Sequence, residues 1–111
     1  MAPHRSSAEH PSFRTFLAER YGAGTSRAAA RREADAAQAA AIELSGEGRA
    51  VTLLGSLLVP SDETVFSLFG AASPEDVAAV GDRTHQPYDR ISEGVPMTPG
   101  RARRAETEPP R

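Results

Sequence analysis

The sequence predicts a small α+β domain in which a four-stranded antiparallel sheet carries two helices on one face. Short runs rich in β-branched and aromatic residues occur with helical segments in the order strand, helix, strand, strand, helix, strand. The central hairpin is apolar on both faces, whereas a hairpin buried on one side only would alternate apolar and polar residues. Two helices on one face leave the other open, so we expect a second cover, either a partner chain or a bound molecule.

The first strand is expected over residues 13–21. Phe13, Leu17 and Tyr21 fall on one side of this segment, and Phe16 and Ala18 fall on the other. The two glycines at 22 and 24 then end the strand.

A long alanine-rich helix is expected next. Thr25 or Ser26 can cap its free amides, nothing interrupts it until about Ser45, and Gly46 and Gly48 supply its stop. Because its apolar stripe carries little bulk, we expect the helix to lie close against the sheet. The stripe consists of Ala30, Ala34, Ala37, Ala41 and Leu44.

The central hairpin joins residues 51–59 to residues 65–69 through the polar turn Pro60–Glu63. Gly55, in the middle of the first of these strands, indicates a bulge or a close backbone approach. Strict alternation places Val51, Leu53, Leu57 and Val59 on one side, with Leu54 and Leu58 opposite them. In the second strand it places Val65 and Phe69 opposite Phe66 and Leu68.

The second helix begins with a compact signal, in which Ser73 is a capping hydroxyl, Pro74 takes the first position and two acids follow. It must end before Pro87. A short last strand is expected at residues 90–95, with Ile91 and Val95 inward. This order of elements is typical of the ferredoxin-like βαββαβ fold, and many such domains pair face to face as dimers.

With 111 residues there is room for one domain, which we place at residues 13–97 between flexible tails at 1–12 and 98–111. The absence of cysteine excludes disulfides and thiolate metal sites. No signal-peptide core or membrane-length apolar run is visible, so a cytoplasmic protein without a membrane partner is expected. The net charge of −2 and the few aromatic residues argue against nucleic acid as a partner.

The chain carries a series of short motifs, which are Glu19-Arg20-Tyr21, Gly48, residues 59–64, Phe66, Leu68-Phe69, Ala72-Ser73, residues 83–87, Asp89-Arg90-Ile91 and Glu93. Together these motifs resemble a bacterial family of small ferredoxin-like domains, in which a few members are described as nickel-binding proteins. The resemblance covers residues 13–97 and implies the same fold and a role in binding nickel or another divalent metal. Members commonly carry cysteines where this chain has Val65 and Ser67. Some have Gly-His-Pro where this chain reads His85-Gln86-Pro87.

His85, Asp89 and Glu93 form the one cluster with metal-ligand chemistry, because imidazole and carboxylate groups suit nickel or zinc. Pro87 prevents these residues from sharing one helical face. The alternative is a polar helix end, in which Asp89 caps a turn, His85 is in water and Glu93 pairs with an arginine.

Glu19 and Arg20 lie in the middle of a predicted central strand, where charges are costly unless they are paired. Since adjacent strand residues point to opposite faces, one of the two must face the helices and the other the open side. A carboxylate on the open side, with Tyr21 near it, could line a pocket or act as a general base. The alternative is a salt bridge at the strand end.

No catalytic motif is visible, and the family resemblance implies a binding protein rather than an enzyme. We predict a homodimer that joins through its sheet faces and binds a small molecule or a metal ion, with His85, Asp89 and Glu93 as the metal donors. The alternative is a dimeric α+β barrel enzyme, monooxygenase- or isomerase-like, with Glu19 acting on an organic substrate between the sheets. A third interpretation is a domain whose apolar face docks on another protein.

Overall fold

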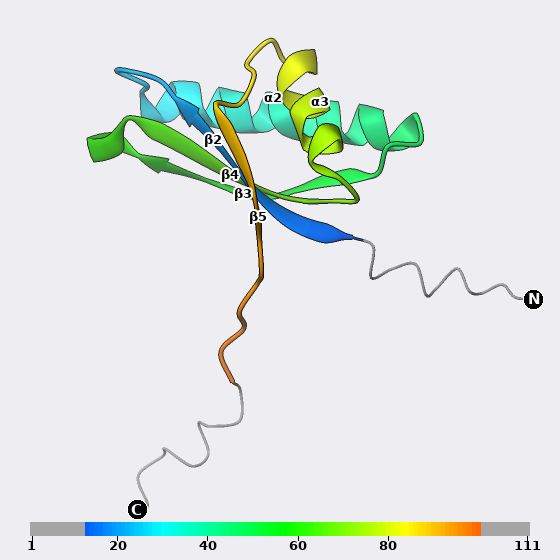
Figure 1. Ribbon diagram of the computed structural model, residues 1–111. Helices are drawn as coiled ribbons and strands as arrows, with labels where there is room; N and C mark the ends of the chain where they lie inside the picture. Colours follow the sequence, from blue (N-terminus) through cyan, green and yellow to red (C-terminus); the bar gives the residue numbers. More distant parts are fainter. Residues whose placement is uncertain (1–12, 101–111) are drawn as a thin grey trace, which may run out of the picture.

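The computed structural model describes residues 13–100 and confirms the ferredoxin-like α+β fold. The four strands form one antiparallel sheet in the order β3-β4-β2-β5, and both helices lie on one face of it (Figure 1). No described helix is long and apolar enough to cross a membrane. The predicted tails lie outside the described residues except for residues 98–100. The elements are β2 (Arg14–Tyr21), α2 (Arg27–Gly46), β3 (Val51–Val59), β4 (Thr64–Ala71), α3 (Pro74–Arg83) and β5 (Arg90–Gly94).

Both helices begin at the hydroxyl caps that the sequence predicts. The side chain of Ser26 accepts a hydrogen bond from the amide of Ala29 at 3.0 Å, and Ser73 accepts one from Asp76 at 3.3 Å. Each bond satisfies an amide that has no partner inside the helix. Beyond the end of α2, Gly48 turns the chain toward β3 with a φ of 96°.

Replacement of Gly48 by alanine should destabilise the fold by about 1–2 kcal/mol, because a side chain at positive φ meets the backbone. Gly46 is the matched control: it ends α2 without positive φ, and a Cβ there would have no neighbour within 4 Å. We expect Gly46→Ala to be neutral or stabilising by up to about 1 kcal/mol. Urea denaturation of both variants measures the difference, and an equal loss in the two would contradict this interpretation.

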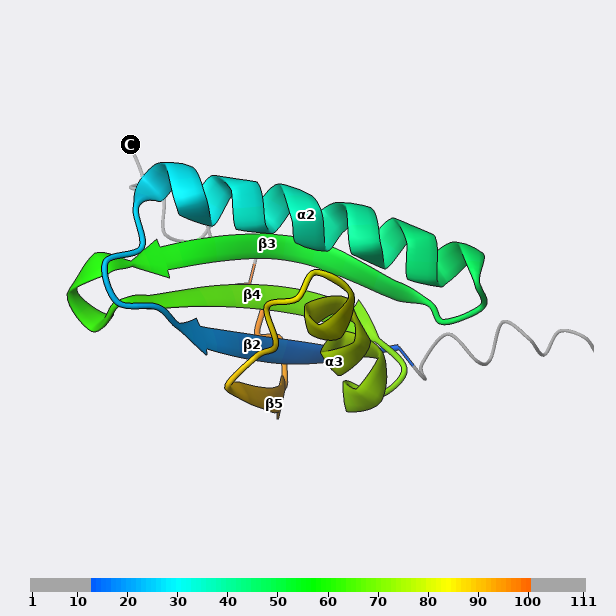
Figure 2. The ribbon, with the colours of Figure 1, turned by 90° about the horizontal axis from the view of Figure 1, so that it is seen from above.

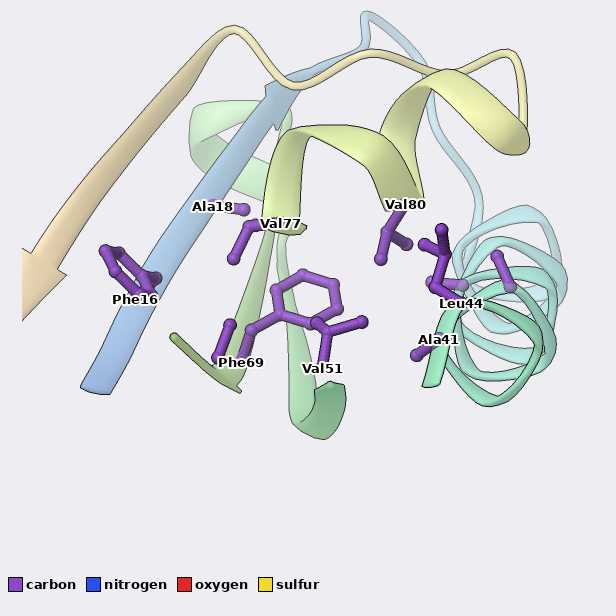
Figure 3. Packing of buried hydrophobic residues seen from close by; sticks show 11 residues of the cluster. Phe16, Ala18, Ala41, Leu44, Val51, Phe69, Val77 and Val80 are labelled. Carbon is purple, nitrogen blue, oxygen red and sulfur yellow. The ribbon is translucent and has the colours of Figure 1, made fainter. Parts of the chain in front are cut away.

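The core lies between the helices and the sheet (Figure 3). Phe69, fully buried on the inner strand β4, meets the ring of Tyr88 edge to face with 5.8 Å between the ring centroids. The alanines of α2 let this helix pack closely on β3. The large, fully buried side chains are Phe16, Leu44, Val51, Val65, Phe69, Val77 and Val80.

The strand pairing sorts the residues of the sheet into two faces. Val65 and Phe69 face the helices, and Phe66 and Leu68 face away, as predicted. The prediction for β3 was wrong in part, because a bulge between Leu53 and Gly55 inserts one extra residue. The alternation inverts at this bulge. Val51 and Leu53 therefore lie toward the helices, whereas Leu57 and Val59 lie on the opposite face.

The last strand is shorter than predicted. Ile91 packs against the core, as expected, but β5 ends at Gly94. Val95, which was expected to point inward, is 80% exposed because it follows the end of the strand.

Candidate functional site

The face of the sheet opposite the helices carries a group of apolar side chains, which we call the open face. Within residues 13–100, no helix or strand covers it (Figure 1). Leu57 and Leu54 are 62% and 55% exposed there. Contiguous exposed apolar patches of this kind mark interaction sites. The open face consists of Phe13, Leu17, Leu54, Leu57, Phe66 and Leu68.

A hollow of ≈ 470 Å³ lies in the middle of the open face. Its lining is apolar apart from Ser56, and Leu17, Leu57, Phe66 and Leu68 provide most of it. The volume falls within the range of small-molecule sites, roughly 300–1,000 Å³. The bulge at Leu54 contributes to this shape, because it brings Gly55, which has no side chain, opposite Leu68.

Glu19 lies beside this hollow, next to Leu17 on β2 and opposite Phe66 on β4. Its side chain is only 14% exposed. One carboxylate oxygen, Oε1, accepts a hydrogen bond from the Tyr21 hydroxyl at 3.0 Å. The other, Oε2, is 3.9 Å from Nε of Arg90 and accepts no hydrogen bond from residues 13–100. This oxygen is therefore available to accept one from a bound molecule.

The backbone around Glu19 is held in place by Asp89. The Asp89 amide donates to the Glu19 carbonyl at 2.7 Å, and the Tyr21 amide donates to Asp89 Oδ2 at 2.7 Å. These two bonds tie the end of β2 to the segment before β5. Asp89 therefore positions the Glu19–Tyr21 pair.

The tyrosine hydroxyl of this pair provides a readout of the Glu19 charge. The hydrogen bond to Glu19, together with its negative charge, raises the pKa of Tyr21 above its ordinary value. Glu19→Gln keeps an acceptor oxygen but removes the negative charge. The Tyr21 phenolate is then no longer repelled by a neighbouring carboxylate, so the pKa of Tyr21 should fall. Absorbance titration measures this directly, since the chain has only Tyr21 and Tyr88 as tyrosines. Asp35→Asn, on the helix layer, is the control and should leave the pKa of Tyr21 unchanged.

The structure does not bring the three predicted metal donors together. His85 is exposed at a φ of 62° after α3, and Asp89 is occupied by the Tyr21 amide. Glu93 faces the helix side of β5, where Arg14 donates to both of its oxygens at 3.0 and 3.1 Å and lowers the pKa of that carboxyl. Residues 13–100 contain no group of three histidine or acidic side chains placed to hold a metal ion. The described donors therefore do not fit a resident metal.

A buried ion pair under the helices was missed by the sequence interpretation. Arg20 points from β2 toward α2 and donates two hydrogen bonds to Glu33, of which the one from Nε measures 2.7 Å. Burial and the negative charge of Glu33 raise the pKa of the neighbouring Tyr88 to about 12. The signal for this pair was the position of Glu33, four residues before Ala37 on the buried stripe of α2.

The fold is shared with a solved structure. Comparison with family models and with curated proteins finds no match. A protein described as "SCO4226 from Streptomyces coelicolor A3(2)" has a crystal structure that aligns with this chain at a TM-score of 0.59 and 22% sequence identity. The alignment covers 77% of this chain and 99% of that one. At this level of identity, the likeness concerns the fold of the chain, a ferredoxin-like α+β domain.

Proposed function

We propose that this protein is a small-ligand-binding homodimer that joins through its open faces and holds an organic molecule in the hollow. The observation that carries the proposal is the carboxylate of Glu19, mostly buried beside an apolar hollow with one oxygen free of hydrogen bonds. A polar group in such a position orients a ligand whose remaining surface is apolar.

Pairing of two open faces accounts for the exposed leucines. Leu57, Leu54 and Leu68 are exposed in the single chain. Their burial against a second copy would remove apolar surface from water, which stabilises the pair by roughly 25 cal/mol per Å². A twofold pairing needs only one self-complementary patch. It would also place two hollows against each other and close them to solvent.

The ligand that fits has an apolar body and one hydrogen-bond donor, such as an amine, hydroxyl or amide. The donor would bind Oε2 of Glu19 while Tyr21 holds Oε1. A metal ion, which the family resemblance implies, is the other ligand class. The described donors do not form a site for one, so it would require ligands from two copies or from outside residues 13–100.

Native mass spectrometry of the full chain tests the ligand directly. The expected result is a dimer that carries extra mass, which Glu19→Ala releases and which denaturation identifies as an organic compound. Calorimetric titration of nickel into the same protein distinguishes the metal class. A dimer that binds nickel stoichiometrically and carries no organic mass would overturn the organic ligand.

An enzyme is the second candidate, because the free oxygen of Glu19 could also act as a general base on a substrate in the closed hollow. Glu19→Gln separates the two candidates once a ligand is known. A binding protein would lose affinity only, whereas an enzyme would keep binding the ligand and stop converting it.

The dimer itself is tested by two matched substitutions. Leu57→Asp places a charge on the open face, and Ile42→Asp places the same charge on α2 at a residue of similar exposure, 62% against 66%. We expect Leu57→Asp to be monomeric, because a buried unpaired charge is strongly penalised, and Ile42→Asp to remain dimeric. Circular dichroism checks that both are folded. A folded Leu57→Asp dimer would contradict the proposed interface.

A further inference from the structure

A second surface of the molecule, the groove between α2 and the edge strand β3, adjoins the open face and shares Leu54 and Leu57 with it. In Figure 2, seen from above, α2 runs beside β3 along the margin of the sheet away from β4. The 20-residue helix and the nine-residue strand are each ~30 Å long. The helix therefore borders the strand over its whole length.

The groove contains two adjoining hollows. The larger, of ≈ 420 Å³, lies between the N-terminal half of α2 and residues 53–58 of β3. The smaller, of ≈ 200 Å³, continues between Gln38 to Ser45 of α2 and residues 51–53. Ala30 and Ala34 line the larger hollow where longer side chains would fill it. The groove is thus open because the helix carries alanine at these positions.

The floor of the groove is the outer edge of β3. This strand pairs with β4 on one side only, so within residues 13–100 its other edge has no strand partner. Beyond the bulge, the pairing of β3 is regular from Gly55 to Val59, which leaves a regular row of backbone donors and acceptors at that edge. Such a row is complementary to an added extended chain. An aliphatic small molecule would leave these polar groups unpaired.

The charge at one end of the groove indicates which kind of peptide it would bind. Arg27 and Arg31 line the larger hollow one helical turn apart, both are exposed, and neither forms an ion pair within residues 13–100. Asp35 is the only acid in the lining. Two unpaired guanidinium groups beside a strand edge favour carboxylates.

We propose that this groove binds an extended acidic peptide of a partner protein, which adds as a fifth strand to β3 beside residues 55–59 and places its carboxylates at Arg27 and Arg31. A single added strand would lie beside β3, next to α2. A second copy of this chain would bring its own α2 to the same margin, where the two helices would compete for one space.

The test uses fluorescein-labelled peptides of seven residues in which valine and threonine alternate. Two glutamates occupy the N-terminal end in one peptide and the C-terminal end in another, and the matching lysine peptides carry two lysines at the same positions. Fluorescence anisotropy with the full chain should show binding of a glutamate peptide at least about tenfold tighter than that of its lysine counterpart. Arg31→Glu should reverse this preference. Ala34→Trp, which fills the groove, should abolish binding of both.

Arg32→Glu is the matched control, because it makes the same charge change on the same helix at a residue outside the groove lining. It should leave the affinity within about twofold of wild type, and so should Leu68→Asp on the open face. An equal loss in Arg32→Glu and Arg31→Glu would show attraction by net charge alone and would overturn the site. So would a fall in solution mass with Ala34→Trp, which would make the groove an interface between copies.

Discussion

Phe69→Ala should lower the free energy of unfolding by about 3–5 kcal/mol, the range for a buried phenylalanine whose removal leaves a cavity. Phe69 is fully buried in a central strand and meets Tyr88 edge to face. Its neighbours in the core, Val51 and Val77, come from different elements and cannot both move to fill the cavity that Phe69→Ala leaves. Urea denaturation at one fixed protein concentration measures the loss.

The matched control for this prediction is Ile42→Ala on the exposed side of α2, where the side chain is 66% exposed. It should change the free energy of unfolding by no more than about 0.5 kcal/mol. A similar loss in the two variants would contradict the position of Phe69 at the centre of the core.

Glu33→Ala should lower the free energy of unfolding by about 3–5 kcal/mol, because it leaves the guanidinium of Arg20 without a partner under the helices. The side chains of Arg20 and Glu33 are 16% and 6% exposed, so water cannot fully replace the lost carboxylate. Glu43→Ala is the control on the same helix. Its side chain is 62% exposed, and its contact with Arg83 spans 3.5 Å, so it should cost less than about 1 kcal/mol.

A double variant separates two effects of Glu33→Ala, which are the loss of the ion pair itself and the burial of an Arg20 charge without a partner. Arg20→Met with Glu33→Met removes both charges and keeps much of the volume, and it should recover most of the stability that Glu33→Ala loses. Chemical denaturation of the wild type and the three variants gives these values. A double variant that is no more stable than Glu33→Ala would show that the loss came from packing and not from the uncompensated arginine.

The order of the elements and both helix caps could be predicted because their causes are local. Ser26 and Ser73 precede helical segments and satisfy amides three residues later. The facing of β2 and β4 followed from simple alternation. The prediction failed in β3 because one extra residue, Leu54, reverses the alternation. Gly55 indicated where a bulge could occur, but not that the residues after it would change faces.

The candidate site depended on contacts between residues distant in the sequence. Glu19 was identified as a possible site residue, yet only the strand pairing places it on the open face. Glu93 was predicted either as a metal donor or as the partner of an arginine, and only the fold identifies that arginine as Arg14, 79 residues away along the chain. The groove beside β3 depends on where α2 sits over the sheet, which periodicity does not determine.

The proposed function depends on two copies of this chain joining through their open faces. Sedimentation equilibrium of the untagged full chain in the micromolar range tests it most directly. Pairing through the open faces should give twice the 11.8 kDa mass of one chain, and Leu57→Asp should give the mass of one chain. A wild-type protein that sediments as a folded monomer throughout this range would rule out pairing through the open faces.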